Sequence, residues 1–168
     1  MPDPLPHVVI TDFINDSLDV ERGILDGIAT VEAIDAISEQ ELVGKIESAD
    51  AVMMYHNLSL TEFTVKRLKQ CKLIVRCGVG FDNVDHPLAR ELGIPVANVP
   101  DYGTEEVADS AIGMALTLTR GIHQYNMRMR SQPDPWMYHI ASPLYRLRGR
   151  VFGIVGLGRI GTATARRA

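Results

Sequence analysis

The sequence predicts an α/β protein: a domain built on a parallel sheet, followed by the beginning of a dinucleotide-binding domain. Two observations predict this fold. Within about the first 100 residues, short apolar segments alternate with helical segments five times, as they do in domains with a parallel sheet. Farther along, an apolar run at 151–155 leads directly into a G-x-G-x-x-G sequence at 156–161, as a strand leads into a phosphate-binding turn.

The expected strands are short, apolar and rich in β-branched residues. This composition is typical of strands that are buried on both faces of a parallel sheet. The expected strands lie at 8–11, within 28–36, and at 51–55, 73–76, 94–97 and 151–155.

Residues that stabilise helix ends locate the expected helices between these strands. Ser17 and Thr61 are suited to cap the N-terminus of a helix, and Gly93 is suited to close one. Ser38 and Glu41 have the spacing of a capping box. Helices are therefore expected at about 17–27, 39–48, 62–70 and 85–92.

A longer helix is expected to start at Thr104, which serves as its N-cap. Glu105 and Glu106 follow at the positive end of the helix dipole, where acidic residues stabilise a helix. Its apolar residues cover a wider arc than a surface helix needs, which favours burial at a junction between domains or subunits. Three prolines interrupt the pattern in residues 131–143, which we expect to form an extended arm or loop.

The three glycines of the 156–161 motif have separate expected roles. Gly156 permits a tight turn, Gly158 leaves room for the backbone to approach a pyrophosphate, and Gly161 lets the next helix pack closely. A glycine turn with no ligand is the alternative. The apolar run directly before the motif favours dinucleotide binding over that alternative.

A helix is expected to begin near Arg159 and to direct its first N–H groups at the phosphates. Ile160 lies in the same first turn, and Arg159 adds a cation. The acidic residue that contacts the ribose in such sites follows about 20 positions later. That position lies beyond Ala168. The sequence therefore does not separate NAD from NADP; we expect NAD, and NADP is not excluded.

Composition and hydropathy indicate a soluble globular protein. The 168 residues are enough for one domain and part of another, and 46% are hydrophobic and 23% charged, which is ordinary for this class. The sequence has neither an apolar run of about 18 residues nor the features of a secretory signal, so we expect a cytoplasmic protein without a membrane partner. Cys71 and Cys77 are expected to be buried free thiols rather than a disulfide or a metal site.

Charge is distributed unevenly along the chain. Residues 1–119 carry 8 Lys and Arg against 20 Asp and Glu, whereas residues 120–168 carry 9 Arg and one acid. An arginine-rich segment is one route to nucleic-acid binding, but these arginines are interspersed with apolar residues and no nucleic-acid-binding motif is present. We therefore expect this segment to meet the acidic half of its own chain or of a second subunit.

Three segments together resemble one family. Residues 74–85, 99–109 and 156–161 are similar to the D-isomer-specific 2-hydroxyacid dehydrogenases, most of all to their C-terminal-binding-protein branch and more distantly to phosphoglycerate dehydrogenase. The resemblance implies a flavodoxin-like substrate domain interrupted by a Rossmann domain, with the active site in the cleft between them. Residues 1–100 then resemble the first part of the substrate domain. Residues 101–168 resemble the start of the cofactor domain, with its dimerisation helix and arm.

The resemblance also implies roles for five residues. The backbone N–H groups of Val79 and Gly80 match those that hold the substrate carboxylate, Arg76 matches a residue that contacts substrate, and Tyr55 matches a pocket residue. Thr104 matches a position near the nicotinamide. The alternatives are a plain turn for the glycine loop, a surface or ion-paired Arg76, a core Tyr55 and a helix cap at Thr104.

The family's catalytic Arg, Glu and His have no match in residues 1–168. We expect this chain to contribute no catalytic residue and no metal ligand, and its five scattered histidines show no carboxylate partner. The expected function is hydride transfer between NAD(P) and a D-2-hydroxy acid or 2-keto acid by a homodimer, with the 168-residue chain inactive alone as an N-terminal fragment. The alternatives are a nucleotide-sensing, co-repressor-like interaction module and a truncated product without function.

Overall fold

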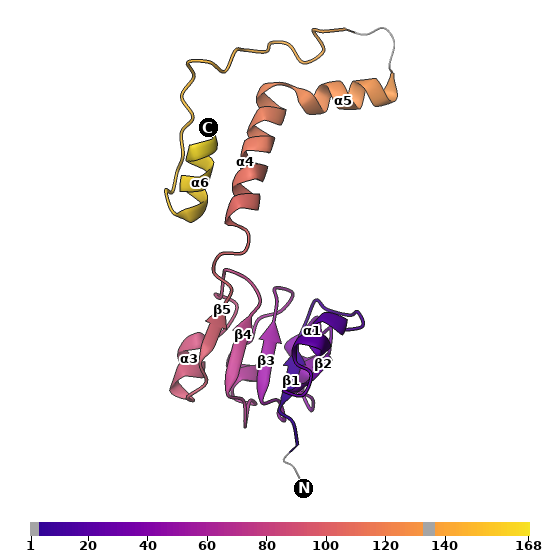
Figure 1. Ribbon diagram of the computed structural model, residues 1–168, viewed down its shortest axis with the longest axis vertical. Helices are drawn as coiled ribbons and strands as arrows, with labels where there is room; N and C mark the ends of the chain where they lie inside the picture. The colour runs from indigo at the N-terminus through magenta and orange to yellow at the C-terminus, as the bar shows by residue number, and fades with distance from the viewer. Residues whose placement is uncertain (1–3, 133–136) are drawn as a thin grey trace. The chain divides into compact units, whose positions relative to one another are not determined.

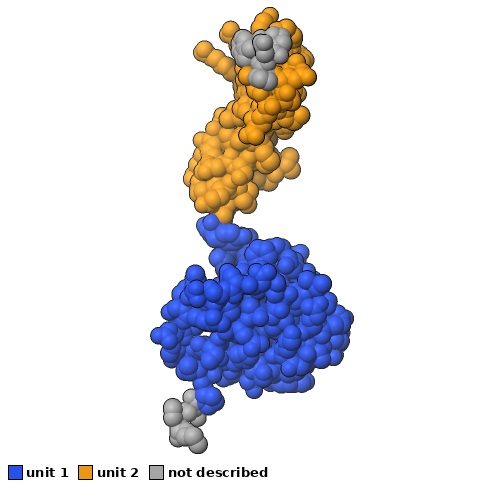
Figure 2. Space-filling model, turned by 90° about the vertical axis from the view of Figure 1, so that its right-hand side faces the viewer, with its two compact units in different colours: residues 1–102 blue, residues 103–168 orange. Residues whose placement is uncertain are grey.

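The computed structural model describes residues 4–132 and 137–168. They form two compact units, residues 1–102 and residues 103–168, which Figure 2 shows in different colours. Among the described residues, no helix combines the length and apolar character that crossing a bilayer requires.

The first unit is built on a five-stranded parallel sheet in the order β2-β1-β3-β4-β5 (Figure 1). All neighbouring strands run parallel, and this order is that of flavodoxin-like folds. The prediction of an α/β fold is confirmed, and each of the first five expected strands is present within two residues of its expected place. The strands are β1 (His7–Ile10), β2 (Thr30–Ala33), β3 (Ala51–Met54), β4 (Leu73–Arg76) and β5 (Val96–Asn98).

Short helices connect the strands, and the core lies where they pack on the sheet. Val52 stands opposite Val9 and Ile74 in the strand register, and all three side chains are fully buried. Leu42 and Val65 bring the helical layer onto the same cluster. The helical elements are α1 (Asp19–Ile24), the 3-10 helix η1 (Glu39–Leu42), α2 (Glu62–Val65) and α3 (His86–Glu91).

One predicted helix start is wrong, and one predicted helix is shorter than expected. Leu18, not Ser17, occupies the N-cap of α1, and the Ser17 hydroxyl instead donates to the Asp19 carboxylate at 2.6 Å. The Ser38 hydroxyl donates to the Glu41 side chain at 3.1 Å rather than capping the backbone, and the expected helix shrinks to the single turn η1.

Tertiary hydrogen bonds fix the start of η1, which ends where Val43 takes an extended conformation. The Glu39 carboxylate accepts hydrogen bonds from the backbone N–H of Thr61, from its hydroxyl and from the Thr64 hydroxyl, all within 2.8 Å. This residue is therefore held against α2. Thr61 caps α2 as predicted, since its hydroxyl accepts from Phe63 N at 3.2 Å, but α2 ends at Val65 rather than near residue 70.

The described residues of the second unit form three helices and irregular segments. The helices are α4 (Thr104–Thr119), α5 (Ile122–Ser131) and α6 (Arg159–Arg167). Gly121 separates α4 from α5 with φ of +63°, and a Cβ there would meet the side chain of Ala141. The second of these helices was not predicted. Of the arm expected at 131–143, residues 133–136 lie outside the described residues, and 137–143 form turns and irregular structure.

Two expectations for this unit need correction. Gly103 occupies the N-cap of α4, and Thr104 is its first helical residue. The expected burial of that helix at a junction between domains or subunits stays a prediction: within its own unit only Ala108 is buried, and Val107, Leu116 and Leu118 are exposed. Residues 151–155 form no strand, and Val151 is almost fully exposed. A strand exists only where a neighbour completes its hydrogen bonds, and the described part of this unit contains no other strand.

Candidate functional site

The predicted substrate-binding residues lie at the carboxyl ends of β3 and β4. Tyr55 directly follows β3, Arg76 ends β4, and Val79 and Gly80 lie in the loop that follows. Because neighbouring strands are parallel, their carboxyl ends meet at one edge of the sheet, which is where α/β proteins bind ligands. The fold therefore brings these four residues to one edge of the first unit.

The loop after β4 presents backbone donors to solvent. Its carbonyl groups are engaged: Val99 N donates to Gly78 O at 3.0 Å, and Asn98 Nδ2 donates to Val79 O at 2.7 Å. Val79 and Gly80 are exposed. Among the described residues, neither N–H group forms a hydrogen bond, although Asp82 Oδ1 lies 3.2 Å from the position that a Cβ on Gly80 would take. Two carbonyl groups thus hold this loop in place, while the N–H groups of two exposed residues form no hydrogen bond within the described residues, an arrangement suited to an anion.

The Arg76 side chain folds back over this loop. A Cβ added to Gly78 would fall 1.7 Å from Arg76 Nη1, so the guanidinium occupies the space that a side chain would need. Its Nε donates to Asn83 Oδ1 at 3.5 Å. Within the described residues, no carboxylate forms an ion pair with Arg76, which argues against the ion-paired alternative. The cation is half-buried and beside the two outward donors.

Tyr55 contributes an aromatic wall at the same edge. Its ring lies 5.3 Å from that of Phe13, whose ring is in turn 4.6 Å from His56. Burial, with a smaller effect of Cys77, raises the pKa of Tyr55 to about 12, so the phenol is neutral. Burial also raises the pKa of Cys77, which keeps this thiol protonated at neutral pH.

Two residues that organise this edge were missed by the sequence reasoning. Asp12 follows β1 and is fully buried, and its carboxylate accepts hydrogen bonds from Tyr55 N at 2.8 Å and Asn57 N at 2.7 Å. Asn83 donates to the Tyr55 carbonyl at 3.0 Å. An acid placed directly after an apolar strand was the available signal for Asp12. Asn83 lies in a segment that carried the family resemblance, but nothing assigned it a role.

The glycine turn of the second unit has the predicted backbone features. Gly156 has φ of +92°, the left-handed conformation that favours glycine. A Cβ on Gly161 would fall 1.9 Å from the Gly156 carbonyl oxygen, so only glycine permits this contact, whereas a Cβ on Gly158 would meet open space. Helix α6 begins at Arg159 as expected, and both Arg159 and Ile160 are exposed.

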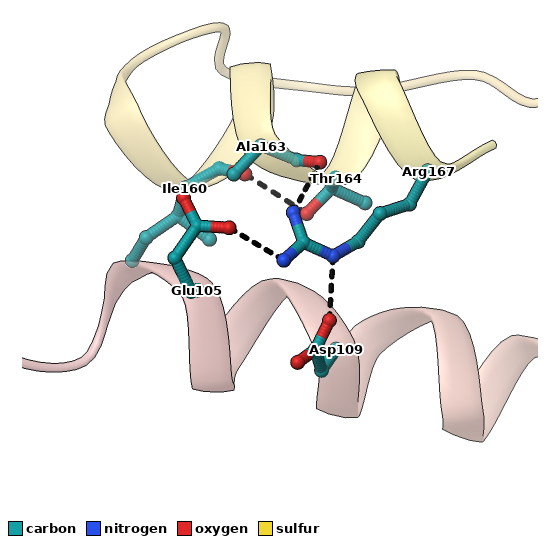
Figure 3. Close-up of polar contacts among 6 residues, drawn as sticks. All are labelled: Glu105, Asp109, Ile160, Ala163, Thr164 and Arg167. Atoms are coloured by element: carbon teal, nitrogen blue, oxygen red, sulfur yellow. Dashed lines mark hydrogen bonds and ion pairs between the residues drawn. The ribbon is translucent and has the colours of Figure 1, made fainter.

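A polar cluster fixes α6 against α4. The Arg167 guanidinium contacts Glu105 and Asp109, one helical turn apart on α4, and donates to the Ala163 carbonyl of its own helix (Figure 3). The buried residues of the two helices, Ala108, Ala163 and Thr164, have small side chains that allow close approach. The helices run side by side with their N-termini at the same end (Figure 1). Thr104 and the glycine turn therefore belong to the same end of the pair.

The remaining titratable groups do not form a second centre. His7 lies 3.6 Å from Glu32, which corrects the expectation that no histidine has a carboxylate neighbour, but this pair is at the amino end of β1. Cys71 is buried, Cys77 is partly buried, and both are free. The described residues include no group of three His, Cys, Asp or Glu side chains placed to hold a metal ion.

Known proteins similar to this chain are 2-hydroxyacid dehydrogenases and their relatives. Residues 8–167 match the family described as "D-isomer specific 2-hydroxyacid dehydrogenase, catalytic domain". C-terminal-binding protein 1 of Caenorhabditis elegans is 37% identical over 154 residues, which are 89% of this chain and 21% of the relative. D-3-phosphoglycerate dehydrogenase of a Synechocystis strain is 33% identical over 153 residues, 90% of this chain and 27% of the relative.

A solved structure shares the same fold. It is an NADPH-dependent glyoxylate/hydroxypyruvate reductase from Sinorhizobium meliloti in complex with NADP and malonate. The TM-score is 0.74 at 29% sequence identity, and the match covers 96% of this chain and 49% of the reductase. The chain thus spans about half of this solved relative, and between a fifth and three tenths of the two curated relatives above.

Proposed function

The chain belongs to the D-isomer specific 2-hydroxyacid dehydrogenase family, and we propose that the protein containing it transfers a hydride between NAD(P) and a D-2-hydroxy acid or the corresponding 2-keto acid. In this proposal, residues 1–100 are part of the substrate domain and residues 101–168 begin the cofactor domain. The division of the structure after Tyr102 supports these boundaries.

The observation that carries the proposal is the anion-binding arrangement after β4. The N–H groups of Val79 and Gly80 would each donate to the substrate carboxylate, and Arg76, which forms no ion pair within the described residues, would supply a charge-assisted donor beside them. Tyr55 would bound the pocket with a neutral phenol that repels no anion. The S. meliloti reductase was crystallised with malonate, itself a carboxylate, which supports a site of this chemistry.

The second unit would bind the dinucleotide. We propose that the pyrophosphate lies against the turn from Gly156 to Gly161, with the N–H groups at the start of α6 and the Arg159 side chain around it. Open space at Gly158 supports this assignment. Thr104 would contact the nicotinamide half. The bound nicotinamide supplies or accepts the hydride. A similar reductase was solved with NADP, so activity with NADH and with NADPH must be measured separately.

The described residues bind and orient rather than move protons. At the carboxyl edge of the first unit, His56 packs on Phe13 and has no carboxylate neighbour among the described residues. A base in this reaction needs a proton-accepting group whose pKa a partner adjusts. We therefore expect the 168 residues alone to show no turnover.

We also propose that the complete protein is a homodimer. Helix α4 exposes apolar side chains within its unit, among them Val107, Leu116 and Leu118. Contiguous apolar patches that a single chain leaves exposed often mark sites of protein–protein interaction. Light scattering of the complete protein would give twice the chain mass, and a monomer at micromolar concentration would contradict the proposal.

The test of the proposed function is NAD(P)H oxidation by the complete protein with a panel of 2-keto acids. Turnover is expected, and Arg76→Gln should lower kcat/KM about 10- to 100-fold, as loss of a charge-assisted hydrogen bond does. Arg22→Gln is the matched control, because Arg22 lies on α1 and donates only to the Ser17 carbonyl. Absence of turnover with every keto acid, or an Arg76→Gln variant as active as the wild type, would refute the proposal.

A further inference from the structure

Asn83 connects two parts of the carboxyl edge through one side chain. Its Nδ2 group donates to the carbonyl of Tyr55 and to that of Leu58, both at 3.0 Å. Two carbonyl acceptors fix which end of the amide carries the nitrogen, because only an NH2 group donates twice. The Oδ1 atom must then face the other way, and it accepts from Arg76 Nε at 3.5 Å.

The backbone around Asn83 is held by its own hydrogen bonds. The carbonyl of Asn83 accepts from Leu60 N at 2.8 Å, and Asp85 N donates back to Leu60 O at 2.8 Å. These bonds form an isolated parallel bridge between Leu60 and Val84. The side-chain amide therefore projects from a fixed point rather than from a free loop.

The contact to Nε determines which atoms of Arg76 remain for a ligand. With Nε turned toward Asn83, the terminal nitrogens point away from it, and Nη1 lies over Gly78. Val79 and Gly80 follow directly in the chain. The terminal fork is the part of arginine that binds carboxylates with two parallel hydrogen bonds.

We propose that Asn83 is a positioning residue that orients the Arg76 guanidinium toward the acid-binding loop. This inference rests on the proposed function of Arg76 and extends it. Asn83 does not touch the ligand: it holds Arg76 through Oδ1 and is itself aligned by the two carbonyls of the 55–58 turn.

A double-mutant cycle in the complete protein tests this role, with KM for a 2-keto acid as the readout. Asn83→Ala should raise KM about 5- to 20-fold with a smaller change in kcat, because Arg76 keeps its charge and loses its orientation. In an Arg76→Met background the same substitution should change KM less than about twofold. Asn57→Ala is the matched control, since Asn57 lies in the same turn and contributes only its backbone N–H to the Asp12 contact.

The outcomes separate this inference from the proposed function. If Arg76→Met leaves KM unchanged, the function assigned to Arg76 fails. The inference is overturned if Arg76→Met raises KM but Asn83→Ala does not. It is also overturned if the rise in KM of the double variant equals the product of the rises in the two single variants, because Asn83 then acts independently of Arg76.

Asn83→Asp is the second variant, in case the alanine variant does not fold. It keeps an acceptor at the position of Oδ1, but its other carboxylate oxygen faces the carbonyls of Tyr55 and Leu58, to which it cannot donate, and its charge neutralises Arg76. KM should therefore rise at least as much as in Asn83→Ala. An unchanged KM in Asn83→Asp would overturn the inference as well. The Nε–H resonance of Arg76 in a nitrogen-15 spectrum gives a readout without turnover: it should shift in both variants and stay in place in Asn57→Ala.

Discussion

Gly161→Ala places a methyl group where the structure has no space. The new Cβ would lie 1.9 Å from the carbonyl oxygen of Gly156, 3.0 Å from its carbonyl carbon and 3.5 Å from Ile154 Cγ2. Ordinary contacts begin at 3.4 Å, so the turn and α6 must separate by about 1.5 Å at their closest point. Because the obstructing atom belongs to the backbone, no side-chain rotation relieves the contact.

Separation of this kind costs about 1–3 kcal/mol, as other overpacked sites do. It also displaces the first N–H groups of α6 from the turn that we propose binds pyrophosphate. If the whole cost falls on the bound form, NAD(P)H affinity drops about 5- to 150-fold. Calorimetric titration of the complete protein with NADH and NADPH measures the affinity, and thermal unfolding shows how much of the cost the free protein already carries.

Two other glycines give matched controls for this prediction. Gly158→Ala meets nothing within 4 Å, so it should leave the melting temperature unchanged and still weaken the nucleotide by about 1–3 kcal/mol, because the methyl occupies the space of the ligand. Gly153→Ala also meets open space and has no proposed ligand, so both readouts should stay at the wild-type value. A Gly161→Ala protein with wild-type melting temperature and affinity would refute the reasoning about close packing.

Three further predictions concern stability and titration. Arg167→Met should lower the melting temperature, because α6 loses its contacts with Glu105 and Asp109. High salt should reduce the difference in melting temperature between the variant and the wild type, because these two acids are exposed, and an unchanged melting temperature at low salt would contradict the prediction. Asp12→Ala leaves buried N–H groups without an acceptor and should cost about 3 kcal/mol in urea unfolding, so a cost below 1 kcal/mol would count against the network. The pKa of Tyr55, followed by ultraviolet absorbance, should be about 12. Because that pKa is above the unfolded value of 10.0, the contribution of Tyr55 to stability is complete below pH 10 and is lost as the pH rises through 12. Titration of all five tyrosines together near pH 10 would contradict this prediction.

The strands of the first unit were predictable because their signal is local. A run of β-branched and apolar residues such as 73–76 is uncommon outside buried strands, and its limits coincide with those of β4. Helix ends were less predictable. Ser38 and Glu41 have the spacing of a capping box, yet the helix ends after one turn at the extended Val43, and its first residue, Glu39, is bound to Thr61 and Thr64. Such partners lie more than 20 positions away and leave no trace in local spacing.

The apolar run at 151–155 shows a different limit. Its composition identifies residues suited to a buried strand, but a strand forms only against a neighbour, and the described residues of its unit supply none. The sequence therefore shows that residues 151–155 are suited to a buried strand, whereas the strand itself depends on the segment that pairs with them.

Some residues of the candidate site were also predictable from local sequence, and others were not. Arg76, Val79 and Gly80 were identifiable because they lie together in a recognisable segment of sequence. Asp12 and Asn83 were not, because they act on backbone atoms of residues 43 and 28 positions away. Their contribution is visible only when the sheet brings the ends of β1, β3 and β4 together.

A crystal structure of the complete protein with NADH and oxalate is the most direct test of the central claim. The account predicts a carboxylate of oxalate within about 3 Å of the Val79 and Gly80 nitrogens and facing Arg76, with the pyrophosphate against the turn at 156–161. Oxalate bound away from that loop, or a nucleotide bound away from that turn, would contradict it.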